Sequence, residues 1–129
     1  MARKDFKIIA EWVKQDSRIL DLGCGDGTLL KILSKERNSS GYGVDTSIDK
    51  IIKSFDNNIN VINADINNRL DYFSDNSFDY VILAQSLQVV NDPVDLIKEM
   101  LRIGNEVIIS FPNMGYWKSR FYSVSYTHL

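Results

Sequence analysis

Apolar residues recur along the chain at two spacings that alternate with each other. A spacing of three to four residues, as in Phe6, Ile9 and Val13, is typical of a helix with one buried face. This spacing predicts helices over residues 6–14, 28–35, 47–55 and 93–103. Short apolar runs predict strands over residues 18–22, 41–45, 60–65, 80–84 and 106–111. Strands that alternate with helices indicate right-handed parallel crossovers, so we predict an α/β fold with a doubly wound, mainly parallel sheet.

Two of these elements have the clearest signals. The helix over 93–103 has Pro93 at an early helical position, and Gly104 follows its last apolar residue. The run from Tyr80 to Ala84 is almost continuously apolar, which is typical of a central parallel strand covered on both faces. The predicted sheet therefore has helices on both sides.

The composition is that of one globular domain. The chain has 129 residues, of which 44% are hydrophobic and 25% are charged. Its formal net charge of −2 lacks the surplus of lysine and arginine that binding to nucleic-acid phosphates requires. No apolar run approaches the ~18 residues of a membrane span, and the N-terminus lacks the apolar core of a signal peptide. We therefore expect neither a nucleic-acid partner nor a membrane partner.

Cys24 is the only cysteine, which excludes an internal disulfide, and no Cys/His cluster has the spacing of a zinc site. We therefore expect no bound metal and a reducing, cytoplasmic location. Cys24 stands between two glycines, and the only histidine, His128, offers no evident partner base. We interpret Cys24 as a small residue tolerated near a ligand rather than as a catalytic thiol.

The candidate chemistry gathers where the predicted strands end. In an open parallel sheet, ligands bind beyond the carboxyl ends of the strands, near the point where the strand order reverses. The segment 21–27 follows the first strand, Asp45 ends the second, Asp65 ends the third, and residues 84–86 follow the fourth. Four separate segments are thus expected to converge on one cleft.

The glycine-rich loop "DLGCGDG" excludes several ligands. A dinucleotide fingerprint starting at Gly23 requires glycine at position 28, where Thr28 stands. The loop contains no lysine, so the phosphate-binding P-loop pattern is absent. A calcium loop counted from Asp21 requires glutamate at its twelfth position, which is Ile32. A tight strand-to-helix turn without any ligand remains the alternative interpretation of this loop.

The acids near the loop favour a different ligand. Asp45 lies 20 residues after Gly25, where a carboxylate can accept hydrogen bonds from both ribose hydroxyls of an adenosine-like group. Asp21 and Asp26 would repel a pyrophosphate but suit an ammonium group or a positive sulfur, while a helix N-terminus can receive a carboxylate. S-adenosylmethionine carries all of these groups. The alternative for Asp45 and Asp65 is a helix cap or a solvated strand end.

The motifs "LDLGCGDG", "GYGVD", "NAD" and "FDYVILAQSLQVV" resemble those of class I S-adenosylmethionine-dependent methyltransferases over residues 18–111. More narrowly, "IIAEWVK", "SLQVVNDP", "EMLRIG" and "IISFPNMGYW" resemble the methionine biosynthesis protein MetW family over about residues 5–117. This resemblance implies a methyltransferase-like fold with a cofactor cleft and a role in methionine biosynthesis. It also implies homoserine O-acyltransferase as the partner protein.

The expected cofactor is S-adenosyl-L-methionine, and its expected ligands follow the strand ends. Asp21, Gly23, Gly25 and Gly27 would shape the amino-acid end, Asp45 would take the ribose, Asp65 and Ile66 would hold the adenine, and Ala84 and Gln85 would border the sulfur. Cys24 and Thr46 are also expected at the cofactor site. No catalytic residue is assigned, although Gln85, Ser86 and Gln88 lie where methyltransferases often contact substrate.

Three functions are compared on these features. The first is a protein that acts with or regulates homoserine O-acyltransferase, and the second is an active methyltransferase with a small-molecule methyl acceptor. The third, a nicotinamide oxidoreductase, is disfavoured because Thr28 replaces the last glycine of the dinucleotide fingerprint.

The C-terminal part of the chain departs from the family pattern. The domain is expected to span residues 1–123, and residues 124–129 form a tail for which a non-native origin is a hypothesis. Class I sheets normally add two more strands after the fifth, and we expect these to be missing, which would leave the strand over 106–111 as an exposed edge. The aromatic residues near this end are interpreted as cover for the sheet, a lid or a partner surface; they are Phe111, Tyr116, Trp117, Phe121 and Tyr122.

Overall fold

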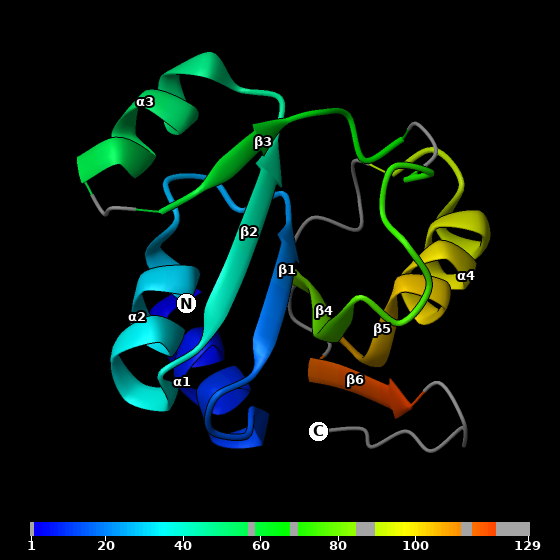
Figure 1. Cartoon of the computed structure of the whole chain (residues 1–129), viewed down its shortest axis with the longest axis horizontal. Coiled ribbons are helices and arrows are strands. Elements are labelled where there is room, and N and C mark those ends of the chain that lie inside the picture. Colours follow the sequence, from blue (N-terminus) through cyan, green and yellow to red (C-terminus); the bar gives the residue numbers. More distant parts are fainter. Residues whose placement is uncertain (1, 57–58, 68–69, 85–89, 112–114, 121–129) are drawn as a thin grey trace.

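The computed structural model describes residues 2–56, 59–67, 70–84, 90–111 and 115–120. They form one six-stranded sheet in the order β3-β2-β1-β4-β5-β6 (Figure 1). The strands are β1 (Arg18–Leu22), β2 (Ser40–Asp45), β3 (Val61–Asn63), β4 (Phe78–Ala84), β5 (Gly104–Phe111) and β6 (Gly115–Arg120). All neighbouring strands pair in parallel except β5 and β6, which are antiparallel. The predicted doubly wound, mainly parallel sheet is confirmed.

Helices cover both faces of this sheet. They are α1 (Ala2–Trp12), α2 (Thr28–Arg37), α3 (Ile48–Asp56) and α4 (Pro93–Ile103). Apolar residues of α1 and α2 pack with Ile19 of β1 in one buried cluster, whereas α4 packs with Leu20 and Leu22 in the other. Figure 1 accordingly shows α1 and α2 on one side and α4 on the other. Among the described residues, no helix is long and apolar enough to cross a membrane.

The helix ends show why the predicted boundaries shift by a few residues. Helix α2 continues to Arg37, two residues beyond its predicted end, and stops where Asn38 adopts a left-handed backbone with φ 51°. Helix α4 begins as predicted, because the side chain of Asp92 accepts a 3.1 Å hydrogen bond from the amide of Asp95 and Pro93 follows this cap. Strand β3 is shorter than its predicted range of 60–65, so Asp65 lies beyond the strand rather than at its end.

Strand β6 corrects the expectation that the fifth strand forms an exposed edge. Residues from Gly115 to Arg120 pair antiparallel with β5, in a register that sets Phe111 opposite Gly115 and Glu106 opposite Arg120. The pairing gives the backbone groups along this side of β5 hydrogen-bond partners that an edge strand would lack. Residues 121–129, which include the predicted tail, lie outside the described part of the chain.

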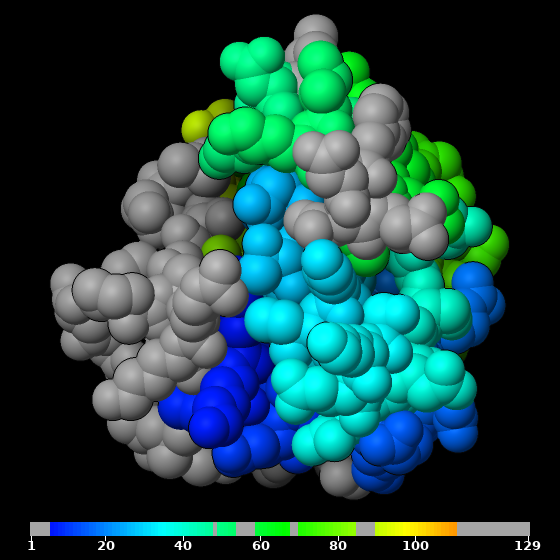
Figure 2. All heavy atoms as spheres, turned by 90° about the vertical axis from the view of Figure 1, so that its left-hand side faces the viewer, coloured from blue at the N-terminus to red at the C-terminus, as the bar shows by residue number. Residues whose placement is uncertain are grey.

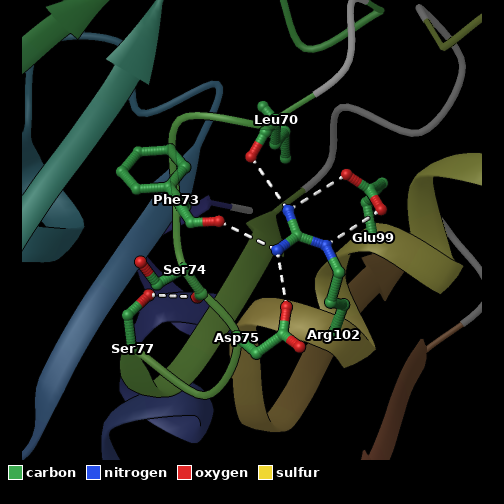
Figure 3. Close-up of polar contacts among 7 residues, drawn as sticks. All are labelled: Leu70, Phe73, Ser74, Asp75, Ser77, Glu99 and Arg102. Carbon is green, nitrogen blue, oxygen red and sulfur yellow. Dashed lines mark hydrogen bonds and ion pairs between the residues drawn. The ribbon is translucent and has the colours of Figure 1, made fainter.

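The connection from β3 to β4 contains no helix in its described residues, 64–67 and 70–77, and Arg102 of α4 holds it in place (Figure 3). The guanidinium donates to the carbonyl oxygens of Leu70 and Phe73, both at 2.9 Å, and to Asp75 Oδ1 at 2.9 Å. It also binds both carboxylate oxygens of Glu99, at 3.1 and 3.2 Å. The planar guanidinium donates hydrogen bonds in several fixed directions, which a lysine ammonium would not do. Arg102 thus joins the connection to α4.

Replacing Arg102 with methionine is expected to lower the free energy of unfolding by about 2–4 kcal/mol, because it removes a group of charge-assisted hydrogen bonds. The Arg102 side chain is only 28% exposed, so solvent does not fully replace these bonds. Urea unfolding measures the change. Arg102→Lys is the matched control: it keeps the charge but not the fork, so it should recover less than half of the loss. Wild-type stability in Arg102→Met would contradict the anchoring role.

Candidate functional site

The strand order reverses between β1 and β4, and the candidate residues lie at that point. Leu22 at the end of β1 is in register with Leu83 of β4 and with Val44 of β2. The loop after β1, the end of β2 and Ala84 therefore meet at one edge of the sheet, as predicted. In Figure 2, the light-blue segment between the green of α3 and the cyan of α2 follows β1 and reaches the surface.

The glycine loop needs its glycines for backbone geometry. Gly23, Gly25 and Gly27 have φ values of 69°, 62° and 84°, a left-handed region that favours glycine. The amides of Gly23 and Cys24 both donate to the carbonyl oxygen of Val44, at 2.7 and 3.1 Å, which ties the loop to β2. The alternation of glycine with other residues in the sequence thus reflects alternating left-handed positions.

Asp45 binds the glycine loop directly. Its Oδ2 accepts a 2.8 Å hydrogen bond from the amide of Gly25, and its Oδ1 accepts one of the same length from the amide of Ser47. The second bond forms the turn that leads into α3. Each carboxylate oxygen has two lone pairs, so both oxygens keep the capacity to accept a further hydrogen bond from a ligand hydroxyl.

Asp21 is a buried acid with one carboxylate oxygen that lacks a partner. Its side chain is 2% exposed, and Oδ1 has no hydrogen-bond partner among the described residues. Burial, and secondarily the charge of Asp45, raise the pKa of Asp21 to about 8. A buried polar atom without a partner is rare, and a strongly shifted acid beside a ligand-binding edge is typical of functional sites. The sequence predicted that Asp21 belongs to the site but not that it is buried.

The side chain of Cys24, within the glycine loop, packs against Gly43 of β2. A Cβ atom placed on Gly43 would lie 2.4 Å from Cys24 Sγ, so the two residues touch without any space between them. Burial, followed by the charges of Asp21 and Asp45, raises the pKa of Cys24 to about 12. The thiol is therefore protonated at neutral pH, which favours its interpretation as a packing residue over a nucleophile.

Asp26 acts locally. Its Oδ1 accepts a 2.6 Å hydrogen bond from the hydroxyl of Thr28 and a 3.1 Å bond from the amide of the same residue. These contacts lower the pKa of Asp26, mainly through the hydroxyl. Because Gly27, the N-cap of α2, has no side chain, Asp26 supplies the acceptor at the start of the helix.

The predicted adenine side lies next to Asp45. The amide of Ala64 donates to the carbonyl oxygen of Asp45 at 3.2 Å, and Asp65 follows as an exposed residue. Asp65 Oδ1 accepts a 2.8 Å hydrogen bond from the amide of Asn67, which forms a local turn. Ile66 is half-buried and packs against the cluster under α4.

The remaining predicted residues are placed unequally. Thr46 is exposed beside Asp45, and Ala84 is half-buried at the end of β4. Gln85, with Ser86 and Gln88, lies outside the described residues. The described part of the chain contains no group of three or more His, Cys, Asp or Glu side chains arranged to hold a metal ion.

Sequence reasoning missed one contact at this edge. Asn67 Oδ1 accepts a 2.8 Å hydrogen bond from the amide of Asn91, 24 residues later in the chain. The dipeptide "NN" at positions 67 and 68 reads as an ordinary loop, and no periodic pattern marks one of its side chains as a bridge.

Comparison with known proteins identifies the family. The family model described as methionine biosynthesis protein MetW matches residues 3–129. The chain belongs to the MetW family. It is also 38% identical over 130 residues to the bifunctional methionine biosynthesis protein MetXA/MetW of Rhodopirellula baltica. That alignment covers 95% of this chain and 21% of the relative, so the chain spans about a fifth of that protein's length.

Solved structures share the fold of this MetW family chain. A chain from the complex of the Haloferax volcanii Trm112 methyltransferase activator matches with a TM-score of 0.74 at 20% identity, covering 84% of this chain and 51% of that one. A Haemonchus contortus phosphoethanolamine N-methyltransferase 2, solved with S-adenosylhomocysteine, matches with a TM-score of 0.74 at 22% identity, covering 88% and 29% respectively. Identities this low show the fold alone, which is that of class I methyltransferases.

Proposed function

We propose that this MetW family chain binds S-adenosyl-L-methionine at the carboxyl edge of its sheet and acts in methionine biosynthesis with homoserine O-acyltransferase, which it assists or regulates. The observation that carries the cofactor proposal is Asp21, a buried acid with an unpartnered oxygen in β1, just before the glycine loop. An ammonium group would supply the positive counter-charge and the hydrogen-bond donors that the Asp21 carboxylate lacks. A pyrophosphate would instead meet repulsion from the charge of Asp45.

The residues present fit the cofactor. The N-terminus of α2 beyond the Thr28 amide, which already donates to Asp26, suits the amino-acid carboxylate, and Asp21 suits the ammonium group. Asp45 and Thr46 would take the ribose hydroxyls, Asp65 and Ile66 the adenine, and Ala84 and Gln85 would border the sulfur. When bound, S-adenosyl-L-methionine supplies an activated methyl group. The chain's own contribution is to bind and orient the cofactor on a loop already fixed to β2.

The relative from Rhodopirellula baltica supports the partner proposal, because its name joins MetXA and MetW in one bifunctional protein. Fusion keeps two activities at high effective concentration, as expected for proteins that act together. The alternative is an active methyltransferase with a small-molecule acceptor, which the methyltransferase fold permits.

Calorimetry with S-adenosylhomocysteine tests the cofactor site. Wild-type protein is expected to bind, and Asp45→Ala to bind at least about tenfold more weakly, because the glycine loop and the ribose both lose a charged acceptor. Asp79→Ala is the matched control: Asp79 Oδ2 also accepts a 2.8 Å hydrogen bond from a backbone amide, that of Arg18, but at the opposite edge of the sheet. Equal affinities in the two variants, or no heat from folded wild-type protein, would refute the assignment.

The two functions differ in what happens to the cofactor. If the chain regulates homoserine O-acyltransferase, adding it changes the acylation rate in a cofactor-dependent way, and S-adenosyl-L-methionine is not consumed. A methyltransferase instead releases S-adenosylhomocysteine only when its acceptor is present. Assays of both products in one reaction mixture distinguish the two outcomes.

A further inference from the structure

The connection between β3 and β4 is attached to α4 at two places. Near the C-terminal end of α4, Arg102 binds Leu70, Phe73 and Asp75 (Figure 3). Near the N-terminal end, Asn67 Oδ1 accepts the 2.8 Å hydrogen bond from the amide of Asn91. Asn91 immediately precedes Asp92, the cap of α4.

The attachment at Asn67 is next to the predicted adenine side of the site. The amide of Asn67 donates to Asp65 Oδ1, so one residue both closes the turn at Asp65 and accepts from Asn91. Strand β3 ends at Asn63, and the described residues 64–67 belong to neither a helix nor a strand. The bond from the Ala64 amide to Asp45 ties the start of this segment to β2, and the side chain of Asn67 fixes the residues that follow it.

Apolar packing supports the same placement. Ile66 and Val90 both pack against the buried cluster under α4, one from each of the two joined segments. Ile66 and Val90 also line a small cavity of about 40 Å³ whose other lining residues are mostly polar: Asn67, Asn91, Asp92, Asp95, Leu96 and Glu99. The loop is thus held by apolar contacts of Ile66 and by the Asn67–Asn91 hydrogen bond, and only the hydrogen bond fixes a direction.

We propose that Asn67 is a positioning residue for the adenosine end of the ligand, acting by holding Asp65 and Ile66 against the start of α4. This inference rests on the proposed binding of S-adenosyl-L-methionine. Asn67 and Asn91 are both exposed, so water can replace their bond and its loss costs little stability. The ligand must then order the loop itself, and its affinity falls.

Titrations with S-adenosylhomocysteine and with 5′-methylthioadenosine, which lacks the amino-acid end, test this role. Asn67→Ala is expected to weaken both ligands by the same factor, about fivefold, because the adenosine is common to both. Asn67→Asp keeps an acceptor oxygen and should bind within about twofold of wild type. The matched control is Ser77→Ala, which removes the 2.8 Å bond from Ser77 Oγ to the carbonyl oxygen of Ser74 at the other end of the connection and should leave both affinities unchanged.

Amide hydrogen exchange without ligand gives a readout that does not depend on binding. The amide of Asn91 should exchange at least about tenfold faster in Asn67→Ala than in wild type. Wild-type affinities or unchanged exchange in Asn67→Ala would overturn the inference, as would an equal loss of affinity in Ser77→Ala. If wild-type protein binds neither ligand while Asn91 exchange still responds to Asn67, the proposed cofactor function fails, and the positioning role falls with it.

Discussion

Replacing Gly43 with alanine is expected to lower the free energy of unfolding by about 1–3 kcal/mol and to remove measurable binding of S-adenosylhomocysteine. The new Cβ would lie 2.4 Å from Sγ and 2.7 Å from Cβ of Cys24, and 3.2 Å from Leu30 Cδ1. Cys24 must therefore move away from β2. Its amide is bonded to Val44, so the whole glycine loop moves with it. Urea unfolding and calorimetry measure the two effects.

A second substitution separates this clash from a general loss of stability. Cys24→Gly removes the two nearest of the three atoms that the new methyl group meets, so the double variant Cys24→Gly/Gly43→Ala should recover most of the binding. Cys24→Gly alone should retain binding, since the protonated thiol has a packing role. Normal affinity in Gly43→Ala, or a double variant no better than the single one, would show that loop placement does not depend on this contact.

Asp21 should make both stability and ligand affinity depend on pH. Its folded pKa of about 8 lies above the ordinary value of 3.8, so the folded chain holds a proton that the unfolded chain releases between these values. The free energy of unfolding should therefore fall as pH rises from about 4 to 8, by at most about 1.4 kcal/mol per unit from this group. A ligand ammonium that requires ionised Asp21 has the opposite trend: its affinity should rise up to about tenfold between pH 6 and 7 and level off above pH 8.

Asp21→Asn tests both trends, because an amide has similar size but does not titrate in this range. The variant should lose the part of the stability slope due to Asp21, and its weakened affinity should no longer rise with pH. The two curves are measured by urea unfolding without ligand and by calorimetry with S-adenosylhomocysteine. A variant that keeps both wild-type slopes would show that another group is responsible.

The fold could be predicted well because its signals are local. Pro93 and Gly104 bound a helix through backbone chemistry that acts within one turn, and the apolar run from Tyr80 to Ala84 needs two buried faces whatever its neighbours are. Strand β6 was missed because Gly115–Arg120 pairs with β5 through backbone groups, and its sequence carries no alternating pattern that demands this partner.

The positions of the candidate residues could be predicted as a set of strand ends but not as a set of contacts. The spacing of Asp45 from Gly25 indicated that the two lie close together, and the structure adds that the carboxylate accepts from the Gly25 amide. The burial of Asp21 depends on helices that cover its face of the sheet. The bonds of Asn67 and Arg102 join side chains to backbone groups 24 to 32 residues away, and such bonds leave no periodic trace in a sequence.

The order of strands in the sheet also constrains how the protein forms. Strands β1 and β4 are neighbours, yet the amide of Arg18 and the carboxylate of Asp79 that join them are 61 residues apart in the chain. Closing so long a loop loses entropy before any contact across it is gained, so this pairing is expected late in folding. The proposed ligand edge lies at that same junction. A nascent chain that has not reached β4 can carry the glycine loop but not the completed edge, so ligand binding would report that the centre of the sheet has assembled.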